Sequence, residues 1–596
     1  MNRFLGLGLS ALLALTACSG KHVELGDTGT GGNGGNGGTS GNGGTSGNGG
    51  TGGVIPPGPK SDQLDLLFVV DNSISMADKQ QLLADAMPEL MSRLTNPRCV
   101  NAAGEPIAQP QSPTDTCPKG SQREISPVRD MHVGVISSSI GAHGGDVCGG
   151  GTEGQDDHAH LIATVRSGLS SYQDQGYLVW DPDGKSGGMT DSAQLVQATT
   201  EHVLAAGELG CGYEAPLEAM YRFLVDPEPP AGVIVGNTGE SEITGIDQEV
   251  LSQRQKFLRP SSILTVVFLT DENDCSMRDD QQSWLVSTSG SNIPRATSAC
   301  AVDPDDPCCQ SCGEAPGPGC PDVNDDPECQ KGAYDQTTED TPNLRCWDQK
   351  RRYGVDWLYP VDRYLKGLTS SQIENRAGQL VPNPLLAARA PGQIVVTGIV
   401  GVPWQDLATP ETLAGSAPLA LQSSSALQWA WLVPTGKTPP TDPLMRESVD
   451  PRTGTQPSTG QALAPPTAGP GANGSNGHEW SPEHDDLQYA CIMPLKEPRN
   501  CQSATGGCDC KSAWEPGYSK NSPLCQVPGT GEYTGYQRFA KAYPGTRHLQ
   551  LLHGLGDRGV VGSVCAKTIE GSVRDVGYGY NPAFTRTLQR LELLLK

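Results

Sequence analysis

Basic residues are scarce in this chain. It has 42 Lys and Arg against 67 Asp and Glu, which gives a net charge of −25. A nucleic-acid binder needs a positive surface to neutralise phosphates, and a protein that docks on anionic lipid needs a basic patch, so the charge argues against both classes. After the N-terminal segment the sequence also lacks a run of about 18 to 20 apolar residues, which is the length of a membrane span.

Motifs of common enzyme chemistry are missing as well. The sequence contains no G-x-S-x-G elbow and no P-loop, which are the signals of α/β-hydrolases and of P-loop nucleotide-binding proteins. A G-x-G-x-x-G pattern at 554–559 precedes an apolar strand pattern instead of following one, which is the wrong context for a dinucleotide site. A catalytic triad that only the fold assembles stays open as an alternative, and the expectation that the protein is not an enzyme belongs to the binding function described below.

The N-terminal segment has the shape of a signal peptide. Arg3 precedes a short apolar run at 5–15, which is too short to span a bilayer. The quartet Leu-Thr-Ala-Cys at 15–18 resembles the box of bacterial lipoproteins. The resemblance implies a signal peptide over 1–17, lipidation of Cys18 and, because Ser19 and not Asp follows, a place on the outer membrane of the bacterial envelope. An ordinary secretory signal with a chance cysteine is the alternative.

Residues 18–59 should form the lipidated cysteine and a flexible tether. Within 26–53, sixteen of the 28 residues are glycine. Such a segment buries too little apolar surface to offset the entropy lost on ordering it. A flexible chain of about 40 residues spans about 35 Å, which would hold a folded domain clear of a lipid surface. The lipid would be the only contact with the membrane.

The chain has 19 cysteines. If Cys18 is lipidated an even number remains, and in an exported protein the expected state is disulfide-bonded. The spacings do not repeat as paired C-x-x-C, so disulfides are favoured over a zinc cluster. We predict the pair Cys99–Cys117 and leave the other connectivities open.

A buried strand followed by a polar turn and a helix is the most informative segment. Residues 64–76 read LDLLFVVDNSISM, and the apolar run 64–70 is typical of a parallel strand buried on both faces. The run ends at Asp71, and apolar residues at helical spacing follow the turn. This order places Asp71 at the carboxyl end of a strand, where ligands bind in open α/β sheets.

The pattern Asp71-x-Ser73-x-Ser75 resembles the metal-ion-dependent adhesion site of von Willebrand factor A-type (VWA) domains. One carboxylate and two hydroxyls on one turn offer the hard oxygen ligands that Mg²⁺ prefers. The resemblance implies a bound divalent cation, with Mg²⁺ favoured and Mn²⁺ or Ca²⁺ as alternatives. It also implies a protein partner that donates a carboxylate to complete the cation's shell.

Two further residues are candidates for this site. A second buried strand pattern at 263–269 ends at Thr270-Asp271, so Asp271 matches the family's distal aspartate. The family's threonine has no counterpart in 208–214, where Glu214 is the nearest oxygen ligand. Alternatively, Glu214 is a glutamate favoured by the positive end of the helix that follows it.

The rest of the sequence alternates strand and helix patterns. Strands are expected at 131–139, 394–402 and 559–566, and helices near 192–206, 214–225, 362–374, 535–542 and the C-terminus. This alternation predicts an α/β fold with a doubly wound, mostly parallel sheet. By the resemblance, the sheet is a VWA-type, Rossmann-like one.

Residues 60–596 should form one such domain, because the last strand and helix lie at its C-terminal end. Long disulfide-rich insertions are expected at about 95–130, 276–355 and 404–530, as surface excursions or as a small second module. The tract at 454–477 is rich in Gly, Pro, Ser and Thr and should be disordered. Two acidic or histidine-containing segments, 156–160 and 322–326, lack a metal-binding motif and are expected to be solvated loops.

The expected function is therefore cation-dependent binding of a protein ligand by an envelope lipoprotein. One alternative is a structural or scaffold role with a vestigial or merely stabilising cation site, which the missing threonine favours. The other is an exported enzyme with its catalytic residues in the insertions, which would require a polar constellation in a cleft away from Asp71.

Overall fold

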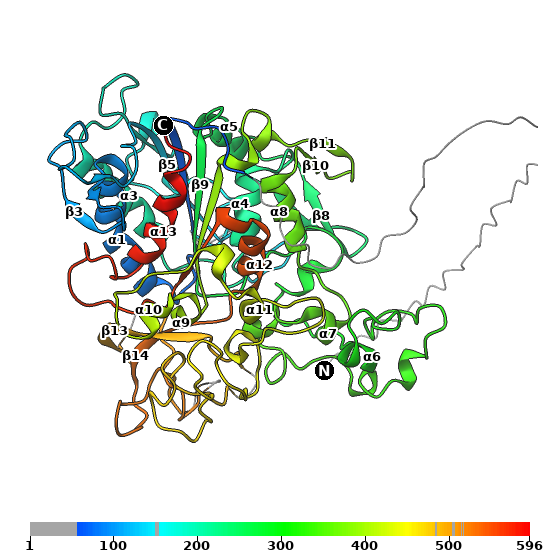
Figure 1. Ribbon diagram of the computed structural model, residues 1–596. Helices are drawn as coiled ribbons and strands as arrows, with labels where there is room; N and C mark the ends of the chain where they lie inside the picture. The colour runs from blue at the N-terminus through cyan, green and yellow to red at the C-terminus, as the bar shows by residue number, and fades with distance from the viewer. Residues whose placement is uncertain (1–55, 149–153, 483–484, 504–506, 514, 516–517) are drawn as a thin grey trace, which may run out of the picture. The chain divides into compact units, whose positions relative to one another are not determined.

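A six-stranded sheet forms the centre of the protein in the computed structural model (Figure 1). The structure describes residues 56–148, 154–482, 485–503, 507–513, 515 and 518–596. The strands lie in the order β15-β12-β9-β1-β5-β6. They are β1 (Gln63–Val70), β5 (Asp130–Ser137), β6 (Leu178–Trp180), β9 (Ile263–Leu269), β12 (Ile394–Val400) and β15 (Gly559–Ser563).

The order of the strands reverses between β1 and β9. Both neighbours of β1 are parallel to it, with Val70 paired to Ser137 of β5 on one side and to Leu269 of β9 on the other. From β1 the chain builds outward through β5 to β6, which is antiparallel, and then returns to build β9, β12 and β15 on the other side. Ligand crevices in open α/β sheets form at such a reversal, beyond the carboxyl ends of the strands.

The central strands are buried on both faces. Every residue of β9 and β12 is buried, as is every residue of β1 after its first. Continuous apolar runs form such strands because helices cover both faces of a parallel sheet. The predicted mostly parallel α/β sheet is confirmed, whereas the three-residue antiparallel strand β6 was not expected from the sequence.

Helices lie on both sides of the sheet (Figure 1). On one side α1 packs against α3 and α13, and on the other α4 packs against α5 and α8, while α8 packs against α12. These helices are α1 (Ala77–Thr95), α3 (Ser192–Leu204), α13 (Asn581–Leu591), α4 (Pro216–Leu224), α5 (Gln248–Phe257), α8 (Val361–Thr369) and α12 (Thr546–Gly554). The helix predicted at 362–374 ends early, and its last residues form a strand of a small hairpin.

Short elements make up most of the remaining chain. Small sheets consist of β2 (Cys99–Val100), β3 (Pro106–Ala108) and β4 (Gln122–Arg123), of β7 (Gly232–Val235) and β8 (Ser241–Thr244), and of β10 (Gln372–Glu374) and β11 (Leu380–Pro382). The short helices are α2 (Ile162–Val165), α6 (Ser298–Val302), α7 (Gln349–Tyr353), α9 (Trp404–Leu407), α10 (Pro410–Leu413) and α11 (Trp429–Leu432).

The segments 276–355 and 404–530 contribute to hydrophobic clusters separate from the main core. One cluster groups Tyr353 and Trp357 with Tyr213 of the sheet domain. Another groups Trp480 and Leu524 with other residues of the later insertion and of β14. Satellite clusters of this kind form where long loops pack over a domain.

The helix expected at 535–542 is a strand instead. Residues Tyr536–Ala542 form β14, which pairs antiparallel with β13 (Cys491–Asn500). A short segment of this kind fits both the helical and the strand period, and pairing with a distant strand decides between helix and strand. Here the partner strand lies some 40 residues away across a loop, so the local sequence did not indicate it.

The tract at 454–477 is hydrogen-bonded and partly buried, in contrast to the disorder expected from its composition. The Gln456 and Asn473 side chains are buried, and Ser475 Oγ donates to Gln456 Oε1 over 3.0 Å. Gln456 Nε2 in turn donates to buried Asp406. Side-chain amides and hydroxyls that bond local backbone and neighbours replace the missing apolar core of the tract.

All cysteines from Cys99 onward pair in nine disulfides, which confirms the predicted disulfide bonding, including Cys99–Cys117. Two pairs link segments over 70 residues apart in sequence and were not foreseen, Cys275–Cys346 and Cys491–Cys565. The others are Cys148–Cys211, Cys300–Cys309, Cys308–Cys320, Cys312–Cys329, Cys501–Cys508 and Cys510–Cys525.

The described residues from 56 onward belong to one compact unit. The predicted signal peptide, Cys18 and most of the tether lie outside the described residues. Among the residues that are described, none of the helices has both the length and the apolar character needed to cross a membrane.

Candidate functional site

Asp71 lies fully buried at the carboxyl end of β1. Its backbone N–H donates to Leu269 O of β9 over 2.9 Å, which continues the sheet ladder by one residue. Its Oδ1 accepts from Ser73 N at 2.8 Å and its Oδ2 accepts from Thr270 Oγ1 at 2.7 Å. The turn after β1 and the end of β9 therefore hold both oxygens of this carboxylate.

Asp271 and the two serines converge beside Asp71. Ser75 Oγ donates to Asp271, at 2.9 Å from Oδ2 and 3.1 Å from Oδ1. Ser73 Oγ lies 3.4 Å from Ser75 Oγ. The parallel register of β1 and β9 brings together residues 200 positions apart in sequence because both strands end at the same edge.

A lysine in the first turn of α1 also reaches this cluster. Lys79 Nζ lies 2.7 Å from Asp271 Oδ2 and donates to Ser75 O over 2.9 Å. Both charged side chains are buried, with 2% of Lys79 and none of Asp271 exposed. The sequence analysis missed Lys79, although a residue four positions after Ser75 at a helix start faces back toward the turn.

Asn72 holds the 208–214 loop against the turn that follows β1. Its Oδ1 accepts from Ser139 Oγ at 2.8 Å, and its backbone O accepts from Gly210 N at 2.7 Å. Ser139 Oγ also accepts from Cys211 N at 2.8 Å. A Cβ at Gly210 would lie 2.4 Å from Asn72 Oδ1, so only glycine allows the loop to approach this closely.

Glu214 precedes α4 and is 6% exposed. Its backbone O accepts from Cys275 N at 2.7 Å. Its carboxylate forms no hydrogen bond or ion pair with another residue that the structure describes. Burial raises the pKa of Glu214 well above its ordinary value, and Asp71 and Asp271 raise it further. The structure thus places Glu214 within electrostatic reach of both aspartates.

The carboxylates of this site repel one another. Burial raises the pKa of Asp71 to about 6, with a further contribution from Asp271, against the lowering effect of the hydrogen bonds from Ser73 and Thr270. A shift of this kind reports the cost of keeping like charges close in a dry environment. A bound cation would remove that cost.

The turn opens into a cavity of about 640 Å³. Ser73, Ile74 and Ser75 form part of its wall, together with the 208–214 loop and the residues 272–275 that follow β9. The volume lies within the range of about 300–1,000 Å³ that small-ligand and side-chain sites occupy.

The two long insertions supply most of the rest of the cavity wall, to which Gln155 also contributes. The residues from 276–355 are Pro342, Asn343, Cys346 and Trp347, and those from 404–530 are Glu447, Asp486, Leu487, Gly507, Cys508 and Asp509. Lys541 in β14 and Tyr543 just after that strand also line the cavity. In Figure 1 the yellow and orange segments of the later insertion gather at one end of the strands. The insertions thus enclose the carboxyl edge of the sheet.

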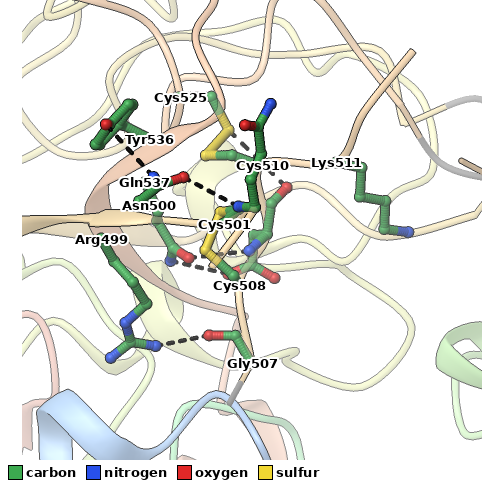
Figure 2. Close-up of a disulfide and its surroundings, with 12 residues drawn as sticks. Arg499, Asn500, Cys501, Gly507, Cys508, Cys510, Lys511, Cys525, Tyr536 and Gln537 are labelled. Atoms are coloured by element: carbon green, nitrogen blue, oxygen red, sulfur yellow. Dashed lines mark hydrogen bonds between the residues drawn. A yellow bond between two sulfur atoms is a disulfide. The ribbon is translucent and has the colours of Figure 1, made fainter. Parts of the chain in front are cut away.

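A disulfide-bonded segment approaches the turn closely. A Cβ at Gly507 would lie 2.4 Å from Ile74 O. Arg499 of β13 donates from Nη1 to Gly507 O over 2.6 Å and pairs with Asp78 of α1 at 2.9 Å. Figure 2 shows the hydrogen bond from Arg499 to Gly507 beside the Cys501–Cys508 disulfide, with Cys510–Cys525 next to it.

The donor set fits a hard divalent cation in its chemistry. Asp71, Ser73, Ser75 and Asp271 present carboxylate and hydroxyl oxygens at one point, and Glu214 lies within electrostatic reach. Lys79 competes for Asp271. Over the described part of the chain, no group of three or more His, Cys, Asp and Glu side chains is positioned to hold a metal ion.

The two other metal candidates stay dispersed. His160 Nε2 lies 2.8 Å from Asp247 and His158 Nε2 lies 3.4 Å from Asp156, so the two histidines engage different carboxylates. The segment 322–326 is a capped turn on the surface.

Comparison of the chain with protein-family models, with curated proteins and with solved structures finds no match.

Proposed function

We propose that this protein is an envelope-anchored binding protein of VWA type, which holds a divalent cation at Asp71, Ser73, Ser75 and Asp271 and binds a protein ligand there. The convergence of these four side chains at the strand-order reversal carries the proposal. Mg²⁺ is the favoured ion, since it prefers oxygen ligands and retains open positions for water or a partner's carboxylate.

The chain's own residues would prepare the site for the ion. Thr270 and the Ser73 backbone orient Asp71, and Ser75 orients Asp271. The bound cation would supply a positive charge that attracts an acidic group of the ligand. Glu214 would join the shell directly or through water, and its negative charge would tune that attraction.

The nine disulfides support an oxidising, exported location, because such bonds persist outside the cytosol. Lipidation of Cys18 and a place on the outer membrane remain part of the proposal, on the lipoprotein-like box alone. The glycine-rich residues 26–53 would then extend the binding domain away from the membrane.

Thermal unfolding with Mg²⁺, Mn²⁺, Ca²⁺ and chelator tests the cation site. A cation that binds only the folded state raises its stability by about 2.7 kcal/mol at a hundredfold excess over the dissociation constant. A pull-down from native envelope with and without chelator tests the ligand. Equal midpoints in all conditions, or a ligand retained in chelator, would overturn the proposal.

A specific observation favours the scaffold alternative. The Lys79 ammonium already neutralises Asp271 over 2.7 Å, so the turn has a built-in cation. If Lys79 makes the metal dispensable, the domain keeps its midpoint in chelator and its partners are held by other surfaces.

A further inference from the structure

The cavity next to the turn is strongly acidic. Among the residues that the structure describes, seven carboxylate side chains line it against one ammonium group, that of Lys541. The acidic residues are Glu208, Glu214, Glu272, Asp274, Glu447, Asp486 and Asp509. Like charges gathered in a partly dry chamber are costly unless something positive joins them.

Three of these carboxylates already have basic partners. Lys541 Nζ lies 3.1 Å from Asp509 and 3.8 Å from Asp486, and Arg547 Nε lies 3.1 Å from Asp274. The basic side chains of Lys541 and Arg547 therefore pair with acidic residues on one part of the cavity wall.

The remaining four glutamates have no ion pair among the described residues. The Glu214 carboxylate also forms no hydrogen bond with another residue that the structure describes, although Glu214 is only 6% exposed and lines the cavity. Glu447 has one, from Asn273 Nδ2 at 3.2 Å. Burial raises the pKa of Glu447 to about 7.

The size of the cavity and its aromatic wall favour an organic cation over a second metal ion. About 640 Å³ greatly exceeds the volume of an ion, and the rings of Tyr213, Trp347 and Tyr543 lie in the wall. A guanidinium pairs with carboxylates through its planar fork and stacks on aromatic faces, so an arginine side chain suits this mixture best.

The mouth of the cavity has an apolar rim. Ile74 is 55% exposed and Leu209 is 66% exposed, and both line the cavity. Exposed apolar side chains around a charged socket suit a macromolecular surface better than a free ion, because the rim would be buried on docking.

We propose that this acidic cavity receives a cationic side chain, arginine above all, of a partner protein that docks on Ile74 and Leu209. The inference rests on the proposed function only in taking a protein as the ligand. It requires no bound metal, since the unpaired glutamates and the rim are present without one.

The test is a calorimetric titration at about pH 8 in chelator with the peptide acetyl-Leu-Arg-Leu-amide. Its citrulline analogue has the same shape without the charge and should bind at least roughly tenfold more weakly. The variants Glu214→Gln and Glu447→Gln should each weaken the arginine peptide by a similar factor. Glu570→Gln, an exposed carboxylate outside the cavity, is the matched control and should change nothing.

Equal binding of the arginine and citrulline peptides, or full binding by both glutamine variants, would overturn the proposal. Spermidine as a free cation separates the two sources of positive charge. If it binds as tightly as the peptide and Leu209→Ser leaves the peptide's affinity unchanged, the site takes a small cation and not a protein side chain. Because chelator is present throughout, failure of the metal site leaves these outcomes unaffected.

Discussion

Lys79 Nζ lies 2.7 Å from Asp271 Oδ2, and both side chains are buried at the end of the central strands. The ammonium occupies one corner of the cluster in which we propose a divalent cation. The protein can therefore fold around its clustered aspartates before any metal binds. A cation entering the site has to compete with, or sit beside, a charge that belongs to the chain.

Lys79→Met should make the fold depend on the cation. Removing one partner of a buried ion pair typically costs about 3–5 kcal/mol, because the other charge is left unpaired. In chelator the variant should unfold at a lower temperature than the wild type, and Mg²⁺ should raise its midpoint more than that of the wild type.

The matched control is Lys366→Met, which breaks an exposed pair with Asp362 of the kind worth about 0–1 kcal/mol. If Lys79→Met and Lys366→Met shift the unfolding midpoint equally and Mg²⁺ changes the midpoint of neither variant, Lys79 does not lie beside a cation site.

Asp71 should make stability fall as the pH rises. Its pKa is about 6 in the folded protein against an ordinary 3.8, so the folded state holds the proton more tightly. This contribution is full below pH 3.8 and is lost as the pH rises through 6, by about 3 kcal/mol for roughly two pKa units. Urea unfolding in chelator at pH 4, 6 and 8 measures it.

Asp71→Asn should flatten that pH profile and abolish stabilisation by Mg²⁺ at pH 8, while Ser73 and Thr270 keep a hydrogen-bonding partner. Asp575→Asn, an exchange in a surface turn, is a suitable control. A variant with the wild-type pH profile would show that another group titrates.

A second carboxyl pair should destabilise the protein in alkali. Burial raises the pKa of Asp442 to about 9, and the hydrogen bond with Asp406 and that residue's charge add to the rise. The stability that this proton contributes is full below pH 3.8, falls as the pH rises from there, and is fully lost above about pH 9. Hydrogen exchange in the 454–477 tract, which bonds to Asp406 through Gln456, should therefore speed up relative to the rest of the protein as the pH rises toward 9.

Asp442→Asn keeps a donor toward Asp406 and should remove this alkaline loosening while leaving exchange at pH 5 unchanged. Exchange in α13, distant from the pair in sequence, serves as the internal reference. Equal alkaline acceleration in the variant would assign the effect to other groups.

The lipid anchor predicts a membrane-bound protein without a spanning segment. Cys18→Ser should release the protein from the outer-membrane fraction and remove the lipid mass from its N-terminus. A Ser19→Ala change is the control, since it leaves the cysteine in place. Membrane fractionation of the Cys18→Ser variant that matches the wild type would refute the anchor.

The sequence determined the five parallel strands of the sheet and the positions of Asp71 and Asp271 at the carboxyl ends of two of them. The runs before Asp71 and Asp271 are apolar throughout, and a strand buried on both faces needs that pattern whatever surrounds it. Periodicity is a local property, so it also located α3, α4 and α13. The even cysteine count after Cys18 was enough to predict disulfides but not their connectivity.

Only the tertiary structure decided which residues surround Asp71 and Asp271. Whether Lys79 reaches Asp271 depends on the register of β1 on β9 and on the direction of α1. A pattern of a few neighbouring residues specifies neither of them. β14 became a strand only because β13 lies beside it. The insertions, which the sequence predicted as disulfide-rich surface excursions or as a small second module, line the carboxyl edge, and Cys275–Cys346 and Cys491–Cys565 tie them to the sheet domain. The acidic cavity is thus a product of long-range contacts, whose partners lie too far apart in sequence for any local pattern to reveal.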